Sequence, residues 1–150
     1  MKFGDVVTAV ASLVVVAYPL AAVLNAVLFP INPLLAFQIG GIPVILVASL
    51  IVGYLFALKI QEESRMGAIG NIVVLFTVVS TVVEVAFMAN PLASPALKEA
   101  LESMFSTSGW TNYDWFVMLG EVVALKIVVA LVLSFIGLYA GSMLRKPKKT

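Results

Sequence analysis

The sequence predicts an all-α protein, an antiparallel bundle of four transmembrane helices in a single membrane domain (residues 1–150). Of its 150 residues, 62% are hydrophobic and only 11% are charged. Water-soluble domains are about half apolar and about a quarter charged. Four stretches are apolar and long enough to cross a bilayer, for which about 20 residues suffice. They cover residues 5–29, 34–59, 66–90 and 114–143.

The first two stretches each contain a proline that bears on their structure. The run at 5–29 is too long for the apolar core of a signal peptide, so we expect a retained span. Pro19 should bend it, which membrane helices tolerate. In the second stretch, Gly41 and Pro43 predict a helix that begins near Ile42, with the proline in its first turn. A re-entrant loop that lines a cavity is the alternative.

Two connections of very different length join the last three stretches. A short polar hairpin at 59–65 leaves no room for a domain. The outer loop, residues 91–113, begins a helix at Ser94 and Pro95 and continues with apolar residues on one side. We expect a short amphipathic helix that rests on the outer membrane surface. A docking face for a partner and a lid over the bundle are the alternatives.

The basic residues predict the orientation of the bundle. If the spans alternate in direction, both termini and the 59–65 hairpin share one side of the membrane. Seven basic residues fall on that side, and Lys98 falls on the other. The positive-inside rule therefore predicts a plasma (cytoplasmic) membrane protein with both termini and the basic tail 144–150 in the cytoplasm. The seven residues are Lys2, Lys59, Arg65, Arg145, Lys146, Lys148 and Lys149.

Three charged residues lie inside the predicted spans, where an isolated charge costs about 2.5 kcal/mol or more. Counted from Asn90 and Trp115, Glu84 and Glu121 lie about 9 Å below the outer surface, and Lys126 lies about 7.5 Å deeper. Two long side chains can bridge that offset. The sequence therefore predicts an intramembrane charge pair between Glu84 and Lys126.

A polar face on the third span and a small-residue face on the fourth predict how the two helices pack. Small residues allow close helix approach, so we expect these faces to meet. Glu121 is about 140° around the helix from Lys126 and should point elsewhere. The third-span face comprises Gly70, Thr77, Ser80, Thr81 and Glu84, and the fourth-span face comprises Lys126, Ala130, Ser134, Gly137 and Gly141.

The composition argues against an enzyme. The chain has no cysteine and no histidine, which removes thiolate metal sites, the usual haem ligand and the usual general base. No phosphate-binding, dinucleotide or hydrolase motif occurs. We expect no cofactor and no metal site. The formal net charge of +1 is too small to argue for nucleic acid.

Two function hypotheses remain. The first is a non-enzymatic structural or accessory subunit of an assembly in the lipid bilayer, either a homo-oligomer or a complex with other membrane subunits. The Glu84–Lys126 pair would then fix helix orientation, and Glu121 would bond between subunits. The alternative is a small proton- or cation-coupled transporter or channel. Its ion site would be made by Glu84 and Glu121 and tuned by Lys126.

Overall fold

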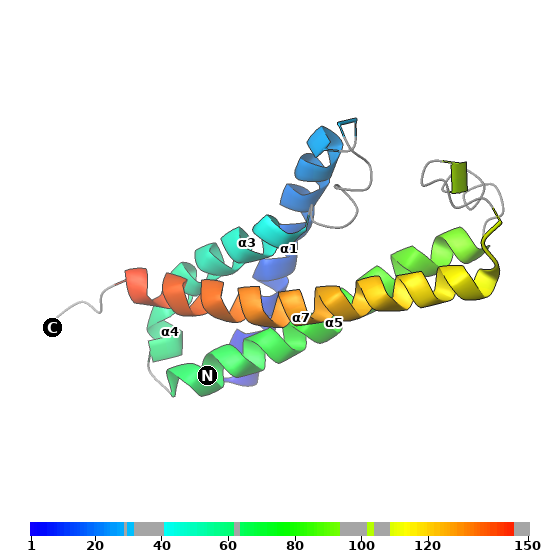
Figure 1. Ribbon diagram of the computed structural model, residues 1–150. Coiled ribbons are helices and arrows are strands. Elements are labelled where there is room, and N and C mark those ends of the chain that lie inside the picture. The colour runs from blue at the N-terminus through cyan, green and yellow to red at the C-terminus, as the bar shows by residue number, and fades with distance from the viewer. Residues whose placement is uncertain (29, 32–40, 62–63, 94–101, 104–108, 146–150) are drawn as a thin grey trace, which may run out of the picture.

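A computed structural model shows a helical protein, which confirms the predicted all-α class (Figure 1). It describes residues 1–28, 30–31, 41–61, 64–93, 102–103 and 109–145, apart from the side chains of 87–93 and 119. No strand occurs in these ranges. Within these ranges, three helices are long and apolar enough to cross a membrane, and a fourth apolar helix is shorter.

The three long helices are α1 (Phe3–Leu28), α5 (Arg65–Ala93) and α7 (Asn112–Leu144). Each begins and ends within three residues of the stretch that the sequence predicts. Helix α1 runs through Pro19 without a break. The 33 residues of α7 extend about 50 Å at 1.5 Å per residue, well beyond the roughly 30 Å of a hydrocarbon core.

The second predicted span, 34–59, is not one continuous helix. Helix α3 (Ile42–Leu55) begins where the sequence predicts, with Gly41 as its N-cap and Pro43 in its first turn. It ends after 14 residues, about 21 Å, and the five-residue helix α4 (Ala57–Gln61) follows. Residues 34–40 lie outside the described residues. Helix length alone therefore does not confirm four spans.

The predicted amphipathic helix of the outer loop lies mostly outside the described residues, although 102–103 are helical. The end of this loop is described and begins α7 with a capping box. The backbone amide of Thr111 donates to Asp114 at 2.8 Å, and the amide of Asp114 donates to the Thr111 hydroxyl at 3.3 Å. The indole of Trp115 is buried and donates to Glu102 at 3.3 Å, which ties the loop to α7.

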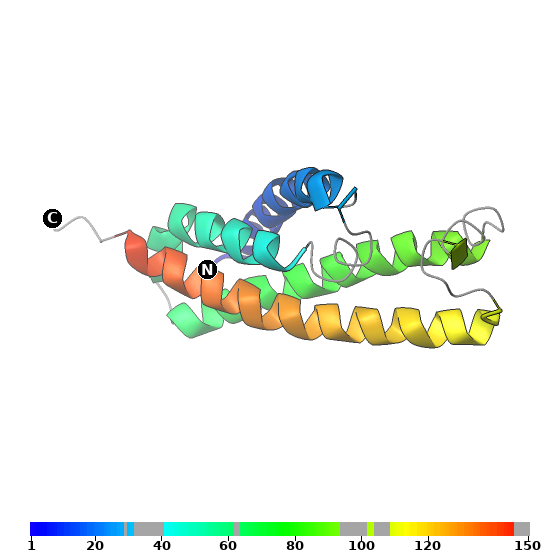
Figure 2. The same cartoon turned by 45° about the horizontal axis from the view of Figure 1, so that its top comes forward.

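Helices α5 and α7 run antiparallel along the length of the molecule, and α3 lies against α7 (Figures 1 and 2). The contact between α3 and α7 is the most extensive of all helix pairs. Helix α1 crosses the others at a steep angle and leans away toward its C-terminal end. The buried core lies where these four helices meet and includes Leu13, Val52, Ile72, Phe76 and Leu138.

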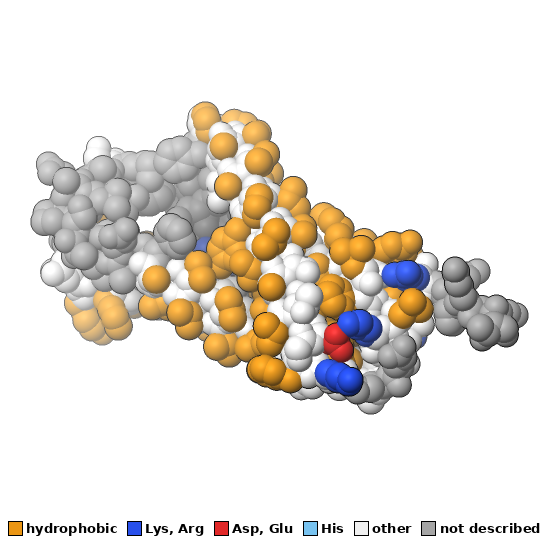
Figure 3. Space-filling view, turned by 180° about the vertical axis from the view of Figure 1, so that it is seen from behind, with side chains coloured by type: hydrophobic (Ala, Val, Ile, Leu, Met, Phe, Trp, Pro, Cys, Tyr) orange, Lys and Arg blue, Asp and Glu red, His pale blue; other side chains and the backbone are white. Residues whose placement is uncertain are grey.

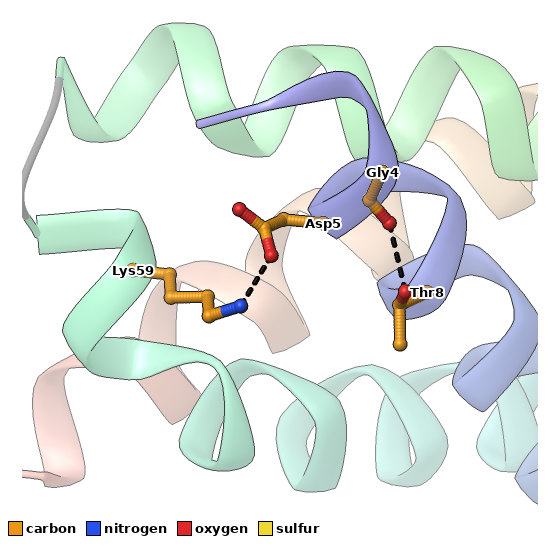
Figure 4. A network of polar contacts seen from close by, with 4 residues as sticks. All are labelled: Gly4, Asp5, Thr8 and Lys59. Atoms are coloured by element: carbon orange, nitrogen blue, oxygen red, sulfur yellow. Dashed lines mark hydrogen bonds and ion pairs between the residues drawn. The ribbon is translucent and has the colours of Figure 1, made fainter.

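The starts of α1 and α5, the ends of α3 and α7, and helix α4 gather at one end of the molecule, which we call the basic end. Lys59 of α4 forms an ion pair with Asp5 at the start of α1 (Figure 4). Lys and Arg side chains cluster near this end on a surface that is otherwise largely apolar (Figure 3). The first helix thus begins at the same level as the hairpin before α5.

Side chains at the basic end cap the last carbonyls of neighbouring helices. Gln61 donates from its side-chain amide to the carbonyl of Ser142 at 2.6 Å and to that of Arg145 at 3.2 Å. Arg145 in turn donates to the Leu55 carbonyl at the end of α3, at 3.4 Å. Helix ends leave such carbonyls without an intrahelical partner. These bonds therefore link α3, α4 and α7 at a common level.

Glycines bring α3 and α7 into backbone contact. A Cβ atom added to Gly137 would lie 2.7 Å from Ser49 Cβ and 2.8 Å from the Leu46 carbonyl oxygen, and one on Gly141 would meet the Leu50 carbonyl. On the facing helix, a Cβ on Gly53 would lie 2.8 Å from a backbone atom of α7. No side-chain atom fits at these positions.

The predicted partner of this glycine pair was wrong. Gly137 and Gly141 pack against α3 rather than against the polar face of α5. The physical reason is complementarity of shape, because α3 presents Ser49 and Gly53 where α7 presents its glycines. By contrast, Gly70 of α5 has open space around the place of a Cβ, so α5 makes no comparably close approach there.

Candidate functional site

Glu84 of α5 and Lys126 of α7 are in contact, with 3.4 Å between Lys126 Nζ and Glu84 Oε2. Their side chains are 30% and 29% exposed, respectively. Glu84 lies 19 residues after Arg65 and Lys126 lies 19 residues before Arg145. Since both arginines are at the basic end, the two charged residues lie at the same distance from that end, about 28 Å along antiparallel helices. The depth offset counted from the outer ends is therefore absent.

A cavity of about 80 Å³ surrounds the ion pair and is lined by residues of all four larger helices. About 10–15 Å³ of such volume is enough to hold one water, so several waters or a small hydrated ion would fit. The polar lining consists of Tyr18, Ser80, Thr81, Glu84 and Lys126. The apolar walls include Ala17 and Ala21 of α1, Val44 and Ile45 of α3, Phe76 of α5, and Val123, Ile127 and Ala130 of α7.

Helical periodicity aligns the α5 residues of the site. Ser80 and Thr81 precede Glu84 by four and three residues, so all three lie on one face of the helix. The Ser80 hydroxyl donates to the backbone carbonyl of Thr77 at 3.1 Å, so its proton is already engaged. The two hydroxyl oxygens place polar atoms on the cavity wall immediately below the carboxylate.

Tyr18 is the site residue that the sequence reasoning missed. It lies half-buried on α1, next to Pro19, and lines the same cavity as Glu84. A signal was present, because a tyrosine well inside an apolar span must bury a hydroxyl that needs a polar partner.

Glu121 does not join this site. Its side chain is exposed on α7 and is not part of the cavity lining. Among the described residues, no hydrogen bond or ion pair of its carboxylate is observed. The structure therefore brings Glu84 together with Lys126 but not with Glu121, so the second acid is not available to complete an ion site with the first.

The other residues assigned to helix packing have separate roles. Ala130 is buried and lines the cavity, while Ser134 is fully buried and donates to the Ala130 carbonyl. Thr77 is buried, and its hydroxyl has no hydrogen-bond partner among the described residues, as is also true of Ser49. The small-residue face of α7 thus contacts α3 near the basic end and the cavity farther along.

No protein-family model, no curated protein and no solved structure matches this chain. Its function is therefore argued from the geometry of the site. A carboxylate and an ammonium that face a cavity large enough for water can exchange protons with that water. The hydroxyls of Tyr18, Ser80 and Thr81 supply further polar contacts for a small ion or for water.

Proposed function

We propose that this chain is an integral membrane protein with four membrane segments that moves protons or small ions through the Glu84–Lys126 cavity. The proposed orientation puts both termini on the cytoplasmic side of a plasma membrane. Two features support these proposals: the arrangement of the helix ends and the depth of the charged residues.

The arrangement of helix ends supports four segments. Asp5 at the start of α1 pairs with Lys59 just before α5, so both helices begin at the basic end. Helix α1 ends about 38 Å away, after 26 residues. The chain must return between α1 and α4, and α3, an apolar helix about 21 Å long, lies on that path. Four basic residues, Lys2, Lys59, Arg65 and Arg145, belong to the segments at this end, as expected for a cytoplasmic face.

The depth of the charges follows from the length of α7. Trp115 and Arg145, residue types favoured at membrane interfaces, lie about 45 Å apart along the helix, close to the full thickness of a bilayer. The midplane then falls near Ala130. Lys126 lies about 6 Å from it and Glu121 about 13 Å, near the boundary of the hydrocarbon core. Glu121 therefore reaches polar surroundings easily, whereas Glu84 and Lys126 lie deep.

The observation that carries the proposal is the cavity around the deep ion pair. A pair that only fixes helix orientation gains from tight packing and needs neither open volume nor extra hydroxyls. Here the two charges face about 80 Å³ of space together with the hydroxyl of Tyr18 and those of Ser80 and Thr81. Ionisable residues inside the membrane that face a cavity commonly mark ion or proton pathways.

The test is ion movement in purified protein reconstituted into liposomes that contain a pH-sensitive dye. Wild-type protein should move protons when an ion gradient is imposed. Glu84→Gln and Lys126→Gln should abolish this movement, while Glu121→Gln, the matched control on α7, should leave it unchanged. If no ion crosses the membrane in liposomes with correctly folded wild-type protein, the transport proposal fails.

A subunit of a larger membrane assembly is the second candidate. The exposed Glu121 favours it, because this acid sits among exposed apolar side chains, including Phe116, Val117 and Leu125. A neighbouring chain that covers this face would supply a polar partner. Purification in mild detergent tests this: Glu121→Gln should then change the oligomeric size or the set of co-purifying membrane proteins without any effect on ion flux.

The orientation can be tested separately, because the chain has no native cysteine. Single cysteines at Ser64, before α5, and at Ser103, in the outer loop, would occupy exposed positions. We expect a membrane-impermeant maleimide to label Ser103→Cys in intact cells and Ser64→Cys only after the membrane is permeabilised. The reverse pattern would invert the proposed orientation, and labelling of both in intact cells would exclude an odd number of crossings between them.

A further inference from the structure

We propose that the cavity binds a small monovalent anion together with a proton, with the anion pairing with the Lys126 ammonium after the Glu84 carboxylate has been protonated. This inference rests on the proposed transport function and names its substrate class. It differs from the cation-coupled alternative in the role of Glu84. Here the Glu84 carboxylate is the anion that normally pairs with Lys126, and a mobile anion takes its place.

The charges that face the cavity decide the sign of the ion. Glu84 comes from α5 and Lys126 from α7, and Tyr18 of α1 is the other titratable group among the described lining residues. The lining residues of α3 carry no ionisable side chain. Over the described lining residues, the charges sum to zero when Glu84 is ionised and to one positive charge when it is protonated.

Coulomb repulsion argues against a mobile cation at this position. Once Glu84 is protonated, a monovalent cation beside the Lys126 ammonium would meet only repulsion, which is stronger in a protein interior than in bulk water. An anion at the same place would be attracted, because the carboxylate no longer competes for the ammonium. Protonation of Glu84 therefore changes the site from one without net charge to one that attracts anions.

The hydrogen-bonding groups point the same way. Lys126, Tyr18 and Thr81 can all donate a hydrogen bond into the cavity, while Glu84 and the Ser80 hydroxyl, whose proton is bonded to Thr77, can accept one. An anion beside Lys126 could therefore accept hydrogen bonds from several of these groups.

The proposed step balances in atoms and charge. A proton from the solution binds the Glu84 carboxylate to give the neutral acid, and the anion takes the place of the carboxylate beside the ammonium. The bound proton and anion together carry no net charge, so their movement across the membrane is electroneutral. By linkage, anion binding must strengthen proton binding by the same factor with which protonation strengthens anion binding.

The test uses chloride and nitrate as probes, with gluconate as the large-anion control, in liposomes that hold the full chain and a pH-sensitive dye. An inward chloride or nitrate gradient should acidify the lumen at least about tenfold faster than an equal gluconate gradient, a factor within the usual range of coupling between sites. The rate should not change when a potassium ionophore clamps the membrane potential, because the step is electroneutral.

Variants of Glu84 and Lys126 distinguish proton uptake from anion binding. Glu84→Gln should retain chloride flux and lose the accompanying acidification, because the amide mimics the protonated acid but cannot release a proton. Lys126→Gln should lose both, and Lys126→Arg, which keeps the charge, should retain both and serves if Lys126→Gln does not fold. Glu121→Gln should behave as wild type.

Two results would overturn the inference in different ways. Sodium or potassium flux that is independent of the anion and coupled to protons would refute anion binding and leave the transport proposal standing. The absence of flux for any ion in folded wild-type protein would refute both. Chloride flux that Glu84→Gln abolishes would also refute the assigned role of this carboxylate.

Discussion

Two regions of this protein bring helices together in opposite ways. Near the basic end, α3 and α7 approach through Gly53, Gly137 and Gly141 until their backbones touch. Farther along, the long side chains of Glu84 and Lys126 meet across an open volume of about 80 Å³. The same helix, α7, takes part in both regions, with glycines against α3 in the first and the long Lys126 side chain against α5 in the second.

This difference indicates where the chain is rigid and where it can accommodate a ligand. Backbone contact between helices gains dispersion energy over many atom pairs, and in lipid such packing is a main source of helix association. An ion pair beside a cavity contributes less and leaves room for solvent. We infer that the glycine contact, together with the caps at the basic end, fixes the scaffold, while the cavity region holds the proposed ion site.

Alanine at Gly141 should produce the largest effect on stability. Its Cβ would meet the Leu50 carbonyl, and backbone atoms of α3 cannot move aside without separating the helices. We expect a loss of about 1–3 kcal/mol in the free energy of unfolding, typical of overpacking. Thermal unfolding of the purified protein in detergent, followed by circular dichroism, measures it.

Gly120→Ala provides the matched control for that substitution. Gly120 lies in the same helix and has open space around the place of a Cβ. Alanine is favoured over glycine inside a helix by about 1 kcal/mol. The control should therefore unfold at the same or a higher temperature. Equal destabilisation by both variants would show that the glycine contact is not what holds α3 to α7.

Breaking the Glu84–Lys126 pair should have the next largest effect on stability. Removal of one partner of a fully buried pair costs about 3–5 kcal/mol, and these side chains are about 30% exposed, so we expect roughly 1–2 kcal/mol for Glu84→Gln or Lys126→Met. The double variant should be more stable than either single variant, because no unpaired charge remains. A double-mutant cycle on thermal unfolding measures this coupling.

If the two single losses in that cycle simply add, the side chains do not interact in the folded protein. The contact at 3.4 Å would then contribute nothing to stability. The ion pair would then make no measurable contribution to the association of α5 with α7. The contrast between a glycine-packed scaffold and a charged cavity would be lost.

The sequence predicts the long helices well because apolar length is a local property. The bounds of α1, α5 and α7 follow from runs of apolar residues and from Thr111 and Asp114, which cap α7. The sequence also predicts the contact between Glu84 and Lys126, although helical rise counted from the outer ends gives an offset of about 7.5 Å that the structure does not show.

The packing partners could not be predicted in the same way. The glycines of α7 were identified as a packing face, but their partner depends on how α3 is tilted and where it ends, which no local pattern reports. Tyr18 joins the site because α1 crosses the other helices near its middle. The spacing of residues within α1 does not show where that crossing falls. Helix-to-helix geometry therefore limits the prediction of this site.

Loss of the caps at the basic end should have a moderate effect. Gln61→Leu would remove the bonds to the carbonyls of Ser142 and Arg145 and keep the apolar part of the side chain. We expect a loss of about 1 kcal/mol, the usual net value of an intramolecular hydrogen bond. Thermal unfolding again measures it, and anion-driven acidification should be unchanged. A loss of flux with no loss of stability would place this end in the pathway rather than in the scaffold.

Asp5→Asn should have the smallest effect, although it removes the ion pair that joins the start of α1 to α4. Ion pairs of exposed side chains contribute little, because water solvates both partners and salt screens their attraction. We expect a change in unfolding temperature close to the error of the measurement, and one that disappears at high ionic strength. A large loss that persists in high salt would mean that this pair is shielded from water. The basic end would then resemble the cavity region, with a desolvated charge pair rather than helix packing as the feature that holds α1 in place.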